Sequence, residues 1–540
     1  MGVKKGWRAT IALFMAMALI LSACGTSGDS EEGTSQSQPI LKLNLPNGEP
    51  TSLDPAKAFD AESMEVVNAL FEGLMRLDAN HQPKPAVAEK VDVSPDGLTY
   101  TFTLRKDVKW SNGEPLTAHD FEYAWKRVLD PKTASSAAFL LYFIENAEEY
   151  NTEKASADQV GVRAKDDYTL EVRLSKPTPF FLQLTAYTVY YPVYKKGLEE
   201  DPKLYENGDS YVSNGPFKMK EWKHDSAVKT VKNEHYREKD RVKLGGIEWA
   251  MVSDPSSAYQ MFKTGKLHSA TPPPDILPSL IKNGEAKVLD GSGLEFFRFN
   301  VEEKPFTNKK IRKAFALAVD RKSIVERVVQ GNQQPALAFV APGTMTQLGD
   351  FREGREELIA DNQVEEAKRL LKEGMKEEGW KSLPTVTLLY NANEKNKLVA
   401  EALQEMYRKN LGVKIKLQSQ ETKVFFDSQI NRNYQMSRSS FLPDYNDPYN
   451  YLESFQTGHS MNRTGWSNKK YDELLEKSTK AKSEEERVKL LQEAEELLME
   501  EMPVFPLYYY NNVIMESPNL KNVLRHPVGP PDYKEAELAE

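Results

Sequence analysis

Short stretches that alternate apolar and polar residues recur along this chain, and segments with helical spacing lie between them. Leu98–Arg105 and Tyr168–Leu174 have the two-residue period of a half-buried strand. Thr117–Leu129 has apolar residues at helical spacing, and Thr117 with Asp120 has the pattern of a capping box. Strands and helices interleaved in this way predict α/β domains.

The second half of the chain predicts further helices with recognisable ends. Residues 321–331 predict a short helix that ends at Gly331 as its C-cap. Ser483 lies three residues before Glu486, which predicts the start of a longer helix that Pro503 ends.

The N-terminal residues have the pattern of a bacterial lipoprotein signal. Three basic residues precede Ala9–Leu21, an apolar stretch too short to span a bilayer, and a small residue then precedes Cys24. Cys24 is the only cysteine, so the chain has no disulfides or thiolate chemistry. The alternative is an ordinary secretory signal with an unrelated cysteine. We expect residues 1–23 to be a signal peptide, Cys24 to be lipidated, and the polar residues 24–38 to be a flexible tether.

The charge of the chain argues against a nucleic-acid partner. Its formal net charge is −9, and removing the three cations Lys4, Lys5 and Arg8 with the signal makes it −12. A nucleic-acid partner would require a basic stripe. The roughly 500 remaining residues are enough for two or three domains with substantial cores.

One stretch, SSFLPDYNDPYNYLE at Ser439–Glu453, places two acids among aromatic and turn-forming residues. Asp444 and Asp447 do not fit an EF-hand loop, because Pro448 and Tyr449 stand where the turn glycine is needed. A carboxylate pair for glycoside hydrolysis remains possible in principle. The simplest reading of the residues is that both acids cap turns and the following helix.

Several motifs resemble, in order, those of the bacterial extracellular solute-binding proteins of family 5, which serve oligopeptide and dipeptide ABC importers. The resemblance covers essentially everything after the tether. It rests on SPDGLTYTFTLRKDVKWSNGEPLTAHDFEYAWKRVLDP (Ser94–Pro131), YVSNGPFKMKEW (from Tyr211), KNLGVKIKL (from Lys409), FLPDYNDP (from Phe441) and MNRTGWSNKKYDELL (from Met461).

The resemblance implies a two-lobed, periplasmic-binding-protein-like α/β fold of type II with an extra inserted domain. The ligand would lie in a cleft between the lobes, which close on it by a hinge motion. The implied division assigns residues 39–71, 196–298 and 512–540 to lobe I, residues 72–195 to the inserted domain, and residues 299–511 to lobe II.

The resemblance also implies roles for individual residues. Asp444 stands where such receptors place the acid that pairs with a peptide α-ammonium, and a carboxylate there would offset the cost of burying the amine. The peptide main chain would be bound in the manner of an added strand, while Asp447 would be structural. The residues implied for main-chain binding are Phe59, Asp60, Ala61, Ser440, Phe441 and Leu442.

Some positions depart from the family pattern. Phe441 replaces a tryptophan found in many relatives, and Gln429 stands at one of two basic positions on the ligand's C-terminal side. Arg438 occupies the other basic position, where the alternative is an ion pair that stabilises the lobe. How the ligand's C-terminus is recognised therefore stays open.

We expect a monomeric, extracytoplasmic receptor for oligopeptides, anchored to the outer face of the cytoplasmic membrane and docking on an ABC permease. No cofactor, metal or catalytic residue is expected, because neither a nucleophile–base constellation nor a metal-ligand spacing is present in the sequence. The alternatives are a receptor for one pheromone or cell-wall peptide, a binding protein for a nickel chelate, haem, sugar or opine, or a secreted hydrolase.

Overall fold

The computed structural model describes residues 38–539. The predicted signal peptide and Cys24 lie outside the described residues, as does all of the predicted tether except Gln38. Residues from Gln38 onward form one compact unit. Among the described residues, no helix is both long and apolar enough to cross a membrane.

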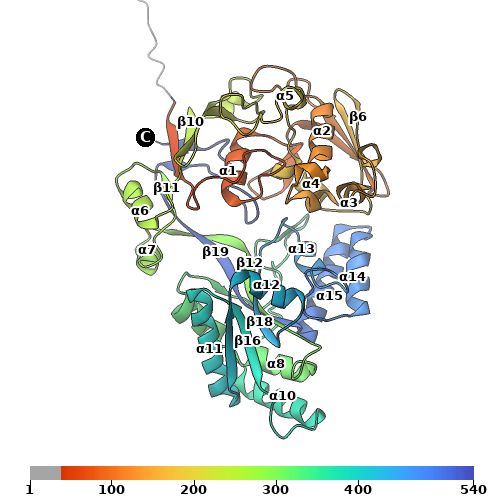
Figure 1. Cartoon of the computed structure of the whole chain (residues 1–540), viewed down its shortest axis with the longest axis vertical. Helices are drawn as coiled ribbons and strands as arrows, with labels where there is room; N and C mark the ends of the chain where they lie inside the picture. The colour runs from red at the N-terminus through yellow and green to blue at the C-terminus, as the bar shows by residue number, and fades with distance from the viewer. Residues whose placement is uncertain (1–37, 540) are drawn as a thin grey trace, which may run out of the picture. The chain divides into compact units, whose positions relative to one another are not determined.

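The first sheet has four strands, in the order β1-β10-β9-β8. Ile40–Asn44 (β1) runs parallel to Gly246–Ala250 (β10), so the start of the described chain pairs with a segment about 200 residues later (Figure 1). The other two strands, Ala227–Lys232 (β9) and Phe217–Lys223 (β8), continue the sheet antiparallel.

A second four-stranded sheet lies within the predicted inserted domain, in the order β4-β5-β7-β6. Its central strands are Thr99–Leu104 (β5) and Thr169–Arg173 (β7), which confirms both strands predicted from the two-residue period. The predicted capping box is also present, because the Asp120 carboxylate accepts a hydrogen bond from the Thr117 N–H. The outer strands are Ala88–Val93 (β4) and Val162–Asp166 (β6), and Ala118–Leu129 (α2) packs on β6 and β7.

The largest sheet has seven strands, and two of these are 13 residues long. The long strands, Lys287–Phe299 (β12) and Val504–Glu516 (β19), are antiparallel to each other. Both strands are buried at one end and partly exposed at the other. The remaining strands are Ser269–Ala270 (β11), Gln334–Pro335 (β13), Val386–Asn391 (β16), Ile415–Gln420 (β17) and Met436–Phe441 (β18).

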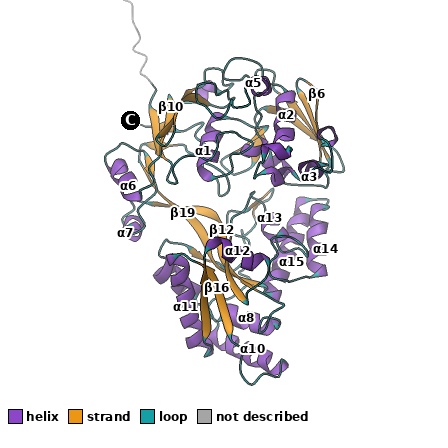
Figure 2. Cartoon of the chain, in the orientation of Figure 1, coloured by secondary structure: helices purple, strands orange, loops and turns teal. Residues whose placement is uncertain are grey.

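Helices lie beside the strands of this sheet, where Glu394–Leu411 (α11) packs on β16 and β17 (Figure 2). The other α-helices are Ala61–Leu70 (α1), Ala147–Asn151 (α3), Phe181–Leu184 (α4), Lys195–Glu200 (α5), Pro255–Lys263 (α6), Leu277–Lys282 (α7), Lys309–Leu317 (α8), Arg321–Ile324 (α9), Val364–Glu377 (α10), Thr422–Ile430 (α12), Pro448–Glu453 (α13), Lys469–Thr479 (α14) and Glu484–Glu501 (α15). Short strand pairs complete the fold: Met75–Leu77 (β2) with Pro83–Pro85 (β3), Met345–Thr346 (β14) with Gly349–Asp350 (β15), and Leu520–Lys521 (β20) with Glu537–Leu538 (β21).

One predicted helix end is wrong by a residue. The helix that begins at Arg321 continues as a π-helical turn, Val325–Val329, and its left-handed C-cap is Gln330 (φ 55°), not Gly331. The wider π turn closes with a hydrogen bond from the Gln330 N–H to the Val325 carbonyl, 2.9 Å, so the left-handed residue comes one position earlier. By contrast, α15 begins after Ser483 as predicted, and the Ser483 hydroxyl accepts from the Glu486 N–H.

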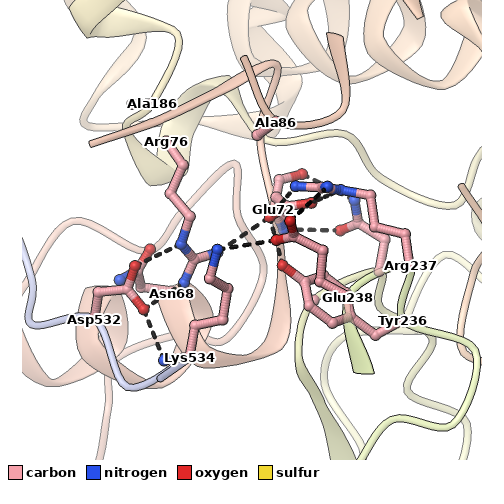
Figure 3. Close-up of polar contacts among 12 residues, drawn as sticks. Asn68, Glu72, Arg76, Ala86, Ala186, Tyr236, Arg237, Glu238, Asp532 and Lys534 are labelled. Atoms are coloured by element: carbon pink, nitrogen blue, oxygen red, sulfur yellow. Dashed lines mark hydrogen bonds and ion pairs between the residues drawn. The ribbon is translucent and has the colours of Figure 1, made fainter. Parts of the chain in front are cut away.

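A buried cluster of ion pairs joins three segments that are far apart in the sequence (Figure 3). Glu72 is 1% exposed and accepts hydrogen bonds from the Tyr236 hydroxyl at 2.6 Å and from Arg237 Nε at 2.9 Å. Arg76 pairs with both carboxylate oxygens of Asp532, at 2.5 and 2.7 Å. The C-terminal segment is thereby attached to the start of the predicted inserted domain.

Candidate ligand-binding site

The predicted main-chain-binding residues Ser440–Leu442 lie at the end of β18, beside β12. Leu294 of β12 pairs with Phe441, and Glu295 pairs with Ser440. Gly293 precedes this pair with a φ of +110°, and a Cβ on Gly293 would lie 2.5 Å from the Phe441 carbonyl oxygen. Only glycine therefore allows β12 to approach β18 this closely at the point where the candidate site begins.

The side chains of this segment differ in exposure. Phe441 is half-buried, with its ring centroid 4.8 Å from that of Tyr451, so an aromatic side chain backs the segment. Ser440 is exposed, and Leu442 is 67% exposed. Leu442 is one of several exposed apolar side chains of the described residues, so its exposure leaves it accessible to a ligand but does not by itself mark a site.

Asp444 is a half-buried acid without an ion pair among the described residues. Burial raises the pKa of its carboxyl to about 6, and a hydrogen bond from Asn450 acts in the opposite direction. Its backbone N–H donates to Asn450 Oδ1 at 2.8 Å, which fixes the loop against α13. A buried carboxyl that lacks a cation has the chemistry needed to bind an ammonium group.

Asp447, three residues later, lies in a different environment. Its carboxylate accepts from the Tyr449 N–H at 2.8 Å, at the start of α13, and pairs with Arg487 at 2.5 Å. Asp447 is 3% exposed and Arg487 is 2% exposed. The helix N–H and the arginine both bind Oδ1 of Asp447, so the charge of this carboxylate is already balanced within the described chain.

Two features near Asp444 were missed by the sequence analysis. Glu453 is a second buried acid; burial raises its pKa to about 7, although it accepts hydrogen bonds from the Tyr445 hydroxyl at 2.8 Å and the Asn450 amide at 3.3 Å. Phe180, from the predicted inserted domain, stacks on Tyr445 with centroids 4.5 Å apart. Neither feature has a local sequence signal, because both depend on contacts made by the folded chain.

The other predicted segment, Phe59–Ala61, lies at the start of α1. Asp60 is its N-cap and accepts from the Ser63 N–H at 2.9 Å and from the Ser63 hydroxyl at 2.6 Å. Although burial acts to raise the pKa of Asp60, hydrogen bonds from Ser63 and Thr51 hold it below its ordinary value. Phe59 contacts Phe139 edge-on at 6.0 Å, and Ala61 is exposed. No hydrogen bond or aromatic contact within residues 38–539 joins this segment to residues 440–444.

Arg438 is engaged in an ion pair. Its guanidinium donates to both oxygens of Glu295, at 2.5 and 2.7 Å, and the Tyr510 hydroxyl donates to the same carboxylate at 2.6 Å. Glu295 is 1% exposed, so this pair also neutralises an acid inside the sheet. The geometry agrees with the ion-pair alternative for Arg438.

Comparisons with known proteins agree with the resemblance noted from the motifs. Residues 82–463 match the model of the bacterial extracellular solute-binding proteins, family 5. The chain is 46% identical over 540 residues to the dipeptide-binding protein DppE of Bacillus subtilis, and 41% identical over 548 residues to its oligopeptide-binding protein OppA. Each alignment covers 99% of both chains.

Solved structures with the same fold include the murein tripeptide-binding protein MppA in its unliganded open form. That structure is 31% identical, with a TM-score of 0.82, and the match covers 93% of this chain and 98% of MppA. OppA of Listeria monocytogenes bound to peptide is 33% identical, with a TM-score of 0.70, and the match covers 93% of this chain and 99% of that one. This chain therefore belongs to the bacterial extracellular solute-binding proteins of family 5.

Proposed function

We propose that this protein captures oligopeptides outside the cytoplasm and delivers them to an ABC importer. The observation that carries the proposal is Asp444, a half-buried carboxyl without an ion pair in the described part of the chain, next to the exposed end of β18. The relatives named for dipeptide and oligopeptide binding support the same ligand class. The family consists of solute-binding proteins rather than enzymes.

In this proposal Asp444 binds the peptide α-ammonium, while Ser440–Leu442 and Phe59–Ala61 bind the extended main chain. Main-chain binding is insensitive to peptide sequence, so one receptor can accept many peptides. Arg438 contributes through its pair with Glu295, which holds β18 on β12, and Asp447 holds the start of α13 on α15.

We further propose that residues 39–71, 196–298 and 512–540 form one lobe, residues 72–195 an inserted domain, and residues 299–511 the opposing lobe. β12 and β19 run through the proposed boundaries and form the connection that bends. The similarity to the unliganded open form of MppA, with a TM-score of 0.82, supports an open state that closes on the ligand by a hinge motion.

The molecules that the purified protein carries test this function. Denaturing the protein and identifying what it releases by mass spectrometry is expected to give a mixture of short peptides within a narrow length range. Adding such a peptide to the emptied protein is expected to lower the radius of gyration in small-angle scattering.

A single defined peptide would favour a receptor for one pheromone or cell-wall peptide. The structural relatives of this chain include the pheromone receptor PrgZ and the murein tripeptide-binding protein MppA. A released metal chelate, sugar or bile acid would contradict the peptide assignment. Cleavage of added peptides would contradict the absence of enzymatic activity.

Peptide affinity is expected to depend on pH through Asp444. Its pKa of about 6 means that the unliganded carboxyl is ionised at pH 7.5 and protonated at pH 5. Since only the carboxylate attracts an ammonium, affinity should be nearly constant above pH 7 and should fall about tenfold per pH unit well below pH 6. Calorimetric titration of one peptide from pH 5 to 8 measures this.

Glu453 titrates in a similar range, with a pKa of about 7, so a control is needed. The same titration of Asp444→Asn is expected to be flat below pH 6. An unchanged pH profile in that variant would assign the dependence to another group.

We also propose that Cys24 carries a lipid that anchors the protein to the outer face of the cytoplasmic membrane, and that the protein acts as a monomer. The lone cysteine after a signal-type stretch supports this anchor. Labelling cells with a fatty-acid analogue is expected to mark the protein, and Cys24→Ser is expected to abolish the label.

A further inference from the structure

Two arginines at one end of the large sheet carry charges that no carboxylate of the described chain balances. Arg298, near the end of β12, is 4% exposed and donates from Nε to the Ser439 hydroxyl at 3.0 Å and from Nη1 to the Met461 carbonyl at 2.7 Å. Arg463 is half-buried, and its backbone N–H donates to the same Met461 carbonyl at 2.9 Å. The two residues therefore meet at Met461.

Both guanidinium groups keep hydrogen-bond donors free. Arg298 Nη2 has no hydrogen-bond partner among residues 38–539. Arg463 donates from Nη1 to Gln429 Oε1 at 3.2 Å and from Nη2 to Met461 Sδ at 3.7 Å, but its Nε is buried and lacks a partner in that range. An unpaired buried donor costs free energy, so free donors on two adjacent cations indicate a missing acceptor.

Other buried arginines of the described chain differ from this pair. Four of them form ion pairs with carboxylates: Arg76 with Asp532, Arg321 with Asp361, Arg438 with Glu295, and Arg487 with Asp447.

Arg312, like Arg298, has no carboxylate partner in residues 38–539, but its position explains this. All three of its nitrogens donate to carbonyl oxygens, which include those of Glu501 at the end of α15 and Phe306. Arg312 therefore satisfies a helix C-terminus. Arg76, Arg321 and Arg487 also keep one buried donor without a hydrogen-bond partner in residues 38–539, so what distinguishes Arg298 and Arg463 is that their free donors belong to cations without a carboxylate.

The groups around the two arginines do not balance their charge. Arg432 also lies near, but Glu302 pairs with it at 3.2 Å. The Tyr434 hydroxyl donates to the Arg463 carbonyl at 2.6 Å, and burial raises its pKa to about 12, so it stays neutral. Burial and the nearby Arg463 lower the pKa of Arg298 to about 10, which still leaves it charged at neutral pH.

We propose that Arg298 and Arg463 form a binding site for a carboxylate. Guanidinium N–H groups are strong donors to carboxylate oxygens, and each member of the pair has one nitrogen without a partner among residues 38–539, Nη2 of Arg298 and Nε of Arg463. Arg463 also places its guanidinium beside Gln429, which stands at one of the two positions that are basic in some relatives. The carboxylate is either part of the bound peptide or a free small anion; only the first source depends on the proposed function.

The test uses Arg463, because replacing the more deeply buried Arg298 would endanger folding. Arg463→Met keeps the aliphatic stem beside the Phe426 ring, from which the guanidinium carbon lies 5.9 Å away. Arg432→Met is the matched control, since it removes a neighbouring arginine that already has a carboxylate partner.

Two measurements distinguish the sources of the carboxylate. Isothermal titration compares a glutamate-containing peptide with its fully amidated analogue. The parent protein is expected to bind the acidic peptide about tenfold or more tightly than the amidated one. Arg463→Met is expected to remove most of this acid preference, and Arg432→Met is expected to retain it. Thermal unfolding in sodium acetate, against sodium chloride at equal ionic strength, reports a free carboxylate. Stabilisation by acetate that requires Arg463, without an acid preference among peptides, assigns the site to a free anion.

The proposal is overturned if Arg463→Met changes neither the acid preference nor the response to acetate. Because the acetate measurement requires no peptide, this outcome is separate from a failure of the proposed function, in which the parent protein would bind neither peptide.

Discussion

Replacing Asp444 with asparagine is expected to lower the affinity for a peptide with a free amino terminus about 100-fold at pH 7.5. The substitution keeps the size of the side chain and removes the charge that would balance a buried ammonium. Truncating one partner of a buried, hydrogen-bonded charge pair costs about 2–5 kcal/mol of binding free energy. A 100-fold loss of affinity corresponds to about 2.7 kcal/mol, which lies within this range. Isothermal titration of the parent protein and the variant measures the change.

An N-acetylated form of the same peptide is the matched control. It carries no ammonium, so it is expected to bind the parent protein weakly and to bind Asp444→Asn with the same weak affinity. If both proteins bound the free peptide with the same affinity, Asp444 would not be the amine anchor.

The same variant is expected to gain folding stability in the absence of peptide. The folded-state pKa of about 6 lies above the ordinary value of 3.8, so ionisation of Asp444 destabilises the folded protein as pH rises from about 4 to 6. Two pKa units correspond to about 3 kcal/mol. A gain of this order in urea unfolding at pH 7.5 would separate loss of binding from loss of the fold.

The second large effect is expected at Glu72, in the buried ion cluster of Figure 3. Replacing it with glutamine removes the carboxylate that accepts from Arg237 and Tyr236, and that lies 3.6 Å from Arg76. Breaking a buried pair by neutralising one partner costs about 3–5 kcal/mol, because the other charge stays buried. Urea unfolding at pH 7 should report a loss of this size.

Glu114→Gln is the control for this substitution. Glu114 pairs with Lys196 at 2.8 Å, but both side chains are exposed, and such pairs contribute about 0–1 kcal/mol. Equal losses at Glu72 and Glu114 would mean that burial is not what makes the cluster important.

The elements with local signals were predictable from the sequence. The strands β5 and β7 follow from a two-residue period, and the start of α15 follows from Ser483 and Glu486, because each signal depends on residues close in the chain. The C-cap after the π-helical turn was misplaced, because the turn closes through a hydrogen bond of unusual span.

The candidate site was likewise predictable in part from local sequence motifs. The ordered motifs identified the family and pointed to the stretch around Asp444. They could not show that Asp447 has an ion pair while Asp444 has none in residues 38–539, because the partner of Asp447 is Arg487, forty residues away in the sequence.

The sequence by itself therefore determined the family, the helices and strands with strong local patterns, and the stretch that holds the candidate site. Only the tertiary structure decided which charged residues are already paired: Arg438 through Glu295 of the neighbouring strand, and Arg298 and Arg463 with no carboxylate in residues 38–539. The physical reason is that desolvation and ion pairing depend on neighbours in space, which local sequence patterns do not encode.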